Sequence, residues 1–88
     1  MKAVVTVVGK DKPGIIASVS GLLFENKINI LDISQTVMSD DIFTMIMLVE
    51  LKTSGMDAVS DKLAKLADDS GLSIHLQNEE VFNSMHRI

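Results

Sequence analysis

The stretch GKDKPG, residues 9–14, separates a strand pattern from a helix pattern. Before it, the β-branched run VVTVV at residues 4–8 is typical of a strand. After it, apolar residues recur at spacings of three and four through residues 15–23, which is the period of a helix. This junction fixes the first two elements and the point where the chain turns back.

The same turn has the chemistry of a small anion site. Gly9 and Gly14 can adopt positive φ or let another backbone or a ligand come close. Pro13 suits the first helical turn, because its missing N–H would have no partner there. Asp11 can accept from the free N–H groups of the helix start. Such donors suit a carboxylate or phosphate, although a plain structural turn is the alternative.

Nucleotide-binding loops do not match this turn. A phosphate-binding loop places Lys-Ser/Thr after its last glycine, whereas Ile15 and Ile16 stand here. The dinucleotide pattern G-x-G-x-x-G is also absent. We therefore do not expect a nucleotide ligand.

Length and composition narrow the classes further. The 88 residues form one small domain, residues 1–88, and the hydrophobic fraction of 47% is sufficient for a core. A net charge of −4 without a basic block disfavours nucleic acid as a partner. There is no cysteine, so disulfides and thiolate sites are excluded. No signal peptide or membrane-length segment is evident, and we expect a soluble cytoplasmic protein without a membrane partner.

The pattern along the chain predicts the order βαββαβ. Gly71 should end the second helix, and the turn residues at 39–41 should connect the second and third strands. The expected elements are a strand at residues 4–8, a helix at 13–26, strands at 28–38 and 42–52, a helix following the apolar stripe of 56–66, a strand at 72–77, and one or two helical turns at 80–88.

This order indicates an α+β, ferredoxin-like fold. We expect a four-stranded antiparallel sheet in the order 4-1-3-2, two helices on one face and a short C-terminal helical tail. The first and third strands are apolar on both sides, as central strands should be. The second strand places Asp32, Ser34 and Thr36 on one side, as an edge strand should. RNA-binding domains of this topology need basic and aromatic residues on the third strand, and residues 42–48 have one aromatic and no basic residue.

One face of this sheet lacks an obvious cover. We expect a second copy, the tail or another protein to cover it, and favour self-association. Phe24 falls outside the core stripe of its helix, and we expect it to pack against the second helix, with an interface as the alternative. The uncovered apolar face consists of Val4, Val8, Ile42, Ile46 and Leu48, with Thr6 among them.

No catalytic or metal-binding constellation is apparent. His75 lies on the polar side of the fourth strand and His86 lies in the tail, and neither has a partner at ligand or catalytic spacing. Acidic pairs such as Asp68-Asp69 lie at element ends, where solvated charge explains them. We expect no enzyme activity, no metal and no cofactor.

The turn GKDKPGII at residues 9–16, followed by NILDI at residues 29–33, resembles the ACT domain, a small module that senses amino acids and other metabolites. The resemblance covers the whole chain. With its ending MHRI at residues 85–88, the chain resembles the stand-alone bacterial ACT proteins of the UPF0237 family. It is also similar to the ACT pair of the glycine cleavage system transcriptional repressor.

The resemblance implies pairing, commonly through edge strands or helices, with an amino acid bound at the interface. Gly14 corresponds to a glycine that lets ligand or partner approach the first loop. Asp11 corresponds to a position that often contacts the ligand's amino group. Asn29 corresponds to a polar position at a strand start that can contact a ligand or the neighbouring loop, although it could serve only to cap the turn that follows the helix.

We therefore predict a non-enzymatic regulatory module that forms a homo-oligomer, with a dimer favoured. Backbone N–H groups between residues 12 and 15 would hold the carboxylate of an amino-acid-like ligand, and Asp11 would hold the ammonium. Because no catalytic domain is attached, a separate protein would receive the signal. The alternative is a protein–protein interaction module that docks a partner on the open sheet face without a small ligand. The predicted ligand-binding residues are Asp11, Lys12, Pro13, Gly14, Ile15 and Asn29.

Overall fold

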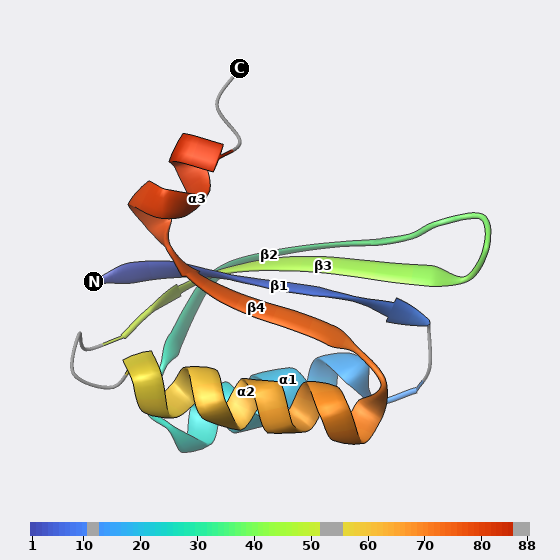
Figure 1. The fold of residues 1–88 in the computed structure, drawn as a ribbon, viewed down its shortest axis with the longest axis horizontal. Coiled ribbons are helices and arrows are strands. Elements are labelled where there is room, and N and C mark those ends of the chain that lie inside the picture. Colours follow the sequence, from blue (N-terminus) through green and yellow to red (C-terminus); the bar gives the residue numbers. More distant parts are fainter. Residues whose placement is uncertain (11–12, 52–55, 86–88) are drawn as a thin grey trace.

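The computed structural model describes residues 1–10, 13–51 and 56–85. Four strands and three helices follow one another in these parts of the chain (Figure 1). They are β1 (Lys2–Lys10), α1 (Ile15–Glu25), β2 (Asn29–Val37), β3 (Ile42–Glu50), α2 (Met56–Ser70), β4 (Ser73–Asn78) and α3 (Glu79–Met85).

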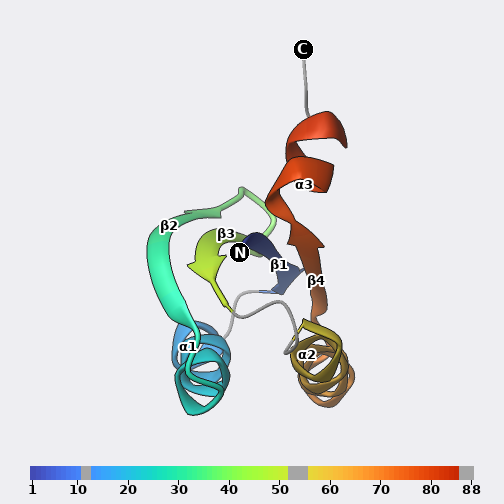
Figure 2. The ribbon, with the colours of Figure 1, turned by 90° about the vertical axis from the view of Figure 1, so that its left-hand side faces the viewer.

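The sheet has the order β2-β3-β1-β4, which confirms the predicted 4-1-3-2 arrangement. β3 pairs antiparallel with both β1 and β2, and β1 pairs antiparallel with β4. α1 and α2 lie side by side under one face, and α3 stands on the opposite side of the sheet (Figure 2). The central position of β1 and β3 follows from their apolar residues on both faces.

The core lies between the sheet and the two long helices. Alternate residues of β1 and β3 point into it, where α1 and α2 contribute one apolar stripe each. Among the described residues, no polar or charged side chain is buried. The fully buried larger side chains are Val5 and Val7 of β1, Met45, Met47 and Val49 of β3, Val19 and Leu23 of α1, and Leu63 of α2.

Two predicted chain reversals are confirmed. Asp41, at φ 60, closes a three-residue hairpin loop in which its N–H donates to the Met38 carbonyl at 3.0 Å. Gly71, at φ 70, ends α2, and the Leu72 N–H reaches back to the Ala67 carbonyl at 3.0 Å. Both loops use the turn residues that the sequence marks.

The start of α1 differs from the prediction. Gly14 has φ 86, in the left-handed region, and is the N-cap of a helix that begins at Ile15. A residue with that φ cannot continue a right-handed helix toward the N-terminus. Pro13 therefore precedes the helix and does not occupy its first turn. The expectation that residues 13–26 are helical is wrong by two residues at the start and one at the end.

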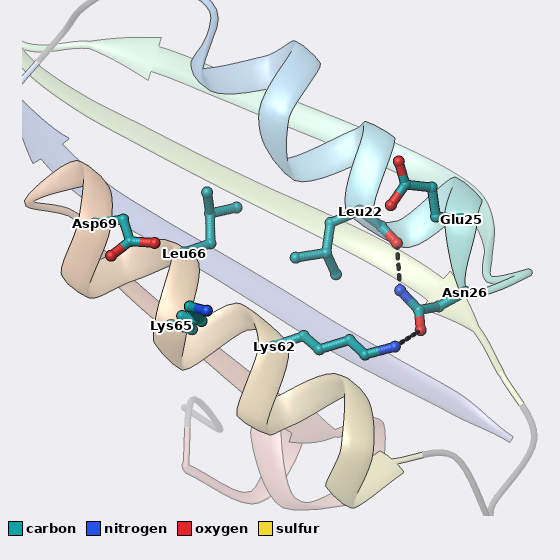
Figure 3. Close-up of a pocket in the computed structure, with 7 residues that line it drawn as sticks. All are labelled: Leu22, Glu25, Asn26, Lys62, Lys65, Leu66 and Asp69. Carbon is teal, nitrogen blue, oxygen red and sulfur yellow. Dashed lines mark hydrogen bonds between the residues drawn. The ribbon is translucent and has the colours of Figure 1, made fainter.

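Phe24 does not pack against α2, so that expectation is wrong. Its side chain is 82% exposed. Leu22 points across to Leu66 of α2 (Figure 3). Phe24 lies two residues further along α1, which turns it about 200° around the helix and away from α2. The alternative that this aromatic belongs to an interface remains as a prediction.

The tail covers only part of the open sheet face. α3 contacts β1 and β4 on the side away from α1 and α2 (Figure 2). At this end Val4 is buried, with 5% exposure, although it points away from the core helices. Ile46, near the middle of β3, keeps 40% of its surface exposed. The open face is therefore half closed by the chain's own C-terminal helix.

Candidate functional site

The turn between β1 and α1 ends in a helix start without a side-chain cap among the described residues. The Gly14 carbonyl accepts the first helical hydrogen bond from the Ser18 N–H at 2.8 Å. In a helix whose N-cap is Gly14, the N–H groups of Ile15 and Ile16 have no partner carbonyl within the helix, and they lie at its positive end. Asp11 and Lys12 lie outside the described residues. The described end of the turn therefore has backbone N–H donors of the kind that the sequence predicts for an anion site.

A pocket of about 260 Å³ lies beside this turn. Residues at the start of α1 and at the end of α2 line it, so Asp69 of α2 and the helix start of α1 border the same pocket. Its lining residues are Pro13, Gly14, Ile15, Ser18, Asp69, Ser70 and Leu72. The pocket thus joins three of the predicted residues to four that were not predicted.

Asp69 is the residue that the sequence reasoning missed. It lies near the C-terminus of α2, where the helix dipole disfavours a negative charge. That unfavourable position is a signal in the sequence, but only the fold places Asp69 at the pocket beside Gly14. A donor-rich helix start and an acidic side chain across one pocket offer partners to both charges of a zwitterion.

The two glycines of the turn have different roles. A Cβ at Gly9 would lie 2.4 Å from Leu72 Cδ2 and 3.4 Å from Leu72 Cα, so Gly9 allows the start of β4 to pack on the end of β1. A Cβ at Gly14 would meet no atom of the described residues within 4 Å, and the φ of 86 is what favours glycine at this position. The space above Gly14 is thus open to a ligand or to a second copy.

Asn29 lies far from the turn within one chain. Its Cα is paired with Glu50, and Glu50 is paired with Lys2 at the beginning of β1. The turn follows Lys10 at the other end of β1, eight residues away, which corresponds to about 26 Å of strand. Asn29 is exposed at that far end. A single chain does not bring Asn29 and the turn together.

A larger hollow of about 450 Å³ runs between α1 and α2 (Figure 3). Asn26 bridges the two helices here, because its Nδ2 donates to the Leu22 carbonyl at 2.7 Å and its Oδ1 accepts from Lys62 Nζ at 2.7 Å. These two bonds occupy the Asn26 amide, which connects the end of α1 to α2. The hollow contains none of the predicted ligand-binding residues and meets the turn pocket only at Asp69.

Exposed large apolar side chains gather on one side of the molecule. Of the eight such residues in the described chain, six belong to α1, β2 or the residue that follows β2. We call these six the α1/β2 flank: Ile16, Phe24, Leu31, Ile33, Val37 and Met38. The other two are Ile46 on the open sheet face and Val81 on α3.

Two other site types can be tested against the described parts of the chain. In residues 1–10, 13–51 and 56–85, no three His, Asp or Glu side chains gather where they could hold a metal ion. In the same ranges, no helix has the length and apolar character needed to cross a membrane.

Comparisons with known proteins give a consistent result. A family model described as ACT domain matches residues 2–77. A UPF0237 protein of Clostridium acetobutylicum is 54% identical over 90 residues, covering all of both chains. The structure of an ACT domain protein from Streptococcus pneumoniae has a TM-score of 0.82 and 40% identity, with 93% of each chain covered. A structure assigned to a glycine cleavage system transcriptional repressor has a TM-score of 0.79 and 29% identity, covering 86% of this chain and 44% of that one.

Proposed function

Because this chain belongs to the ACT domain family, we propose that it is a non-enzymatic regulatory module that self-associates and binds an amino acid or a similar small metabolite between two copies. ACT domains are generally regulatory and bind amino acids or small metabolites. A related structure assigned to a transcriptional repressor contains this fold in 44% of its length.

The turn between β1 and α1 holds the ligand's carboxylate. This assignment rests on the helix start after Gly14, which has no side-chain cap among the described residues and where N–H groups and the helix dipole favour an anion. The Lys12 N–H is a predicted donor from the turn, and the Ile15 N–H is the first donor of the helix. The absence of a Cβ at Gly14 leaves the approach to these donors open.

An acidic side chain holds the ligand's ammonium. Asp11 is the predicted partner from the turn itself. Asp69 borders the adjoining pocket from the end of α2 and is the second candidate for this contact. A pocket of about 260 Å³ has room for a molecule of the size of an amino acid.

The second copy supplies Asn29. Because Asn29 and the turn lie at opposite ends of the sheet, both can contact one ligand only if two chains lie antiparallel to each other. A two-fold dimer produces this arrangement twice, with one site at each end of the interface. Ligand binding and self-association are then linked, and each strengthens the other.

The test is a thermal-shift panel of the proteinogenic amino acids at millimolar concentration. A ligand present at 100 times its Kd and bound only to the folded protein adds about 2.7 kcal/mol. For a domain of this size that corresponds to a rise in Tm of roughly 10 °C or more. A panel in which no amino acid raises Tm contradicts the proposed function.

Two variants test the residues. Gly14→Asn keeps an amino acid that tolerates positive φ and adds a side chain only to open space, so the fold should remain and ligand binding should fall at least tenfold. Asn29→Ala should weaken binding from the opposite end of the chain. Asn83→Ala, an exposed amide on α3, is the matched control and should bind as the wild type does. Equal binding by Gly14→Asn and the wild type would remove the turn as the site.

A second candidate function rests on Ile46. This side chain is 40% exposed in the half of the open face that α3 leaves uncovered. A partner protein docking there would make the chain an interaction module without a small ligand. Ile46→Asp should then abolish association while the amino-acid panel stays flat. If the isolated chain is a monomer and Ile46→Asp leaves it as soluble and stable as the wild type, the open face is not an interface and this candidate fails.

A further inference from the structure

The turn pocket and the larger hollow lie on one groove between α1 and α2. The Asn26 side chain joins the end of α1 to Lys62 in the first half of α2, whereas the turn pocket joins the start of α1 to Asp69 at the end of α2. The two helices therefore run antiparallel. On the side of α1 that faces α2, Ser18 lines the turn pocket, and Leu22, one turn later, lines the hollow. Asp69 borders both, so the two cavities meet end to end.

The charges along this groove alternate in sign. The start of α1 brings the positive end of a helix dipole to the turn pocket. Asp69 follows, as a carboxylate at the boundary of the two cavities. Lys65 and Lys62 line the hollow one and two turns of α2 before Asp69, about 6 and 10 Å along the helix axis. From the turn into the hollow, the groove thus presents a positive, a negative and again a positive group.

The charged side chains of the groove are available to a ligand. Lys62, Lys65 and Asp69 are all exposed. Lys62 Nζ donates to Asn26 Oδ1 at 2.7 Å and has further N–H donors beyond this one (Figure 3). In the described parts of the chain, neither the Lys65 nor the Asp69 side chain forms a hydrogen bond or an ion pair. Glu25, the other acidic residue of the hollow, is the neighbour of Asn26, at the end away from Asp69.

Apolar side chains line the middle of the groove. Leu22 of α1 and Leu66 of α2 point toward each other across it, and both are half-buried (Figure 3). An aliphatic chain lying over them removes apolar surface from water and leaves no polar group unpaired. The groove therefore suits a ligand whose charged groups are separated by an aliphatic segment.

We propose that this groove extends the ligand site, and that the ligand is an amino acid with a second carboxylate at the end of a side chain as long as that of glutamate. The inference rests on the proposed function. The α-carboxylate lies at the start of α1, the ammonium meets Asp69, and the side chain passes over Leu22 to end at Lys65. One helical turn, about 6 Å, separates Asp69 from Lys65, and an extended glutamate spans this length. Aspartate is shorter, and glutamine has the length without the charge.

The experiment measures how tightly the full chain binds glutamate, glutamine, aspartate and ornithine, by calorimetric titration. The variants are Lys65→Glu and Lys65→Gln. Lys2→Glu is the matched control, because Lys2 is exposed at the beginning of β1, at the end of the sheet away from the turn. Urea unfolding shows whether each variant folds. Light scattering after size exclusion, across a dilution series without ligand, gives the dissociation constant of the dimer.

The wild type should bind glutamate about fivefold more tightly than glutamine or aspartate, the effect expected of exposed charge pairs. Lys65→Gln should remove this preference. Lys65→Glu should reverse it, so that ornithine, which carries an ammonium where glutamate carries its distal carboxylate, binds more tightly than glutamate. Lys2→Glu should bind all four amino acids as the wild type does. The dissociation constant of the dimer should be the same in every variant, because the groove and the α1/β2 flank lie on different sides of α1.

The inference is overturned if the wild type binds glutamate no more tightly than glutamine, or if Lys65→Glu keeps the wild-type order. A reversed order that appears only together with a changed dissociation constant of the dimer also counts against it. In each of these cases, binding of any amino acid in the thermal-shift panel leaves the proposed function standing. A panel in which no amino acid raises Tm refutes the proposed function and the inference together.

Discussion

The two outer strands of the sheet, β2 and β4, differ in length, exposure and the helix that accompanies them. β2 has nine residues, of which all but Ile30 are exposed, and α1 beside it carries Glu25 as its one charged side chain. β4 has six residues, most of them half buried, and α2 beside it carries charges along its outer side. The β4 side is thus closed against water, whereas the β2 side resembles half of an interface.

This difference predicts two classes of variant. Substitutions on the β4 and α2 side should change the stability of the single chain. Substitutions on the β2 and α1 side should change association and leave the single chain folded.

Leu63→Ala should have the largest effect on stability. Leu63 is 1% exposed at the centre of the α2 stripe, and removing three carbons there leaves a cavity in the core. We expect a loss of about 2–5 kcal/mol in the free energy of unfolding, measured by urea denaturation. Lys65→Ala on the exposed side of the same helix is the control and should change stability by less than about 0.5 kcal/mol. A loss below about 1 kcal/mol for Leu63→Ala would mean that the β4 and α2 side of the molecule is not tightly packed.

Ile33→Lys should have the largest effect on association. Ile33 is 43% exposed in the middle of β2, and a charge there both removes apolar burial and faces its counterpart across a two-fold axis. The expected cost is about 2 kcal/mol, which raises the dissociation constant about 30-fold. The dilution series by light scattering measures it, and circular dichroism should show an unchanged fold.

His75→Lys is the matched control for Ile33→Lys. His75 is exposed on β4, the other edge strand, and its ring is 3.1 Å from the Ser73 hydroxyl. A lysine there should leave the dissociation constant unchanged. If His75→Lys separates the copies and Ile33→Lys does not, the interface lies on the β4 side and the comparison is reversed.

Gly9→Ala should have an intermediate effect, confined to the stability of the single chain. The added Cβ would lie 2.4 Å from Leu72 Cδ2, so Leu72 must shift in a place where it is buried. Crowding of this kind costs about 1–2 kcal/mol in unfolding free energy. Thermal and urea unfolding measure it, and the dissociation constant should not change. Unchanged stability would show that Leu72 can move without cost, and that the contact between the end of β1 and the start of β4 is loosely packed.

The sequence predicts most of the fold because its periodicities agree with one another. The apolar strands at residues 4–8 and 42–52 had to be central, and the turn residues 39–41 and 71 had to reverse the chain. The start of α1 was misplaced because proline favours both the first helical turn and the residue before an N-cap. Only the observed φ of Gly14 separates these two possibilities.

The candidate site could be predicted less completely, because it is not continuous in the sequence. The turn is local, and its donors follow from a helix start. Asp69 comes from the far end of another helix, and no pattern connects it with Gly14 before the chain folds. The direction of Phe24 was misjudged because helical spacing places a residue on a face of its helix but does not show on which side the neighbouring helix lies.

The smallest predicted effect compares how the two long helices end. Both ends have a residue in the left-handed region followed by a backward hydrogen bond, which runs from the Ile28 N–H to the Leu23 carbonyl at 3.0 Å in α1. In α2 the left-handed residue is Gly71, whereas in α1 it is Lys27, at φ 60.

A non-glycine residue in this conformation costs about 1–2 kcal/mol, and a glycine adds about 0.5–1 kcal/mol of unfolded-state entropy. Lys27→Gly should therefore stabilise the chain by about 0.5 kcal/mol in urea unfolding, and Gly71→Lys should destabilise it by a similar amount or more. Because Lys27 is exposed, the substitution by glycine removes no packing. A decrease in stability for Lys27→Gly would therefore show that the Lys27 side chain itself stabilises the end of α1.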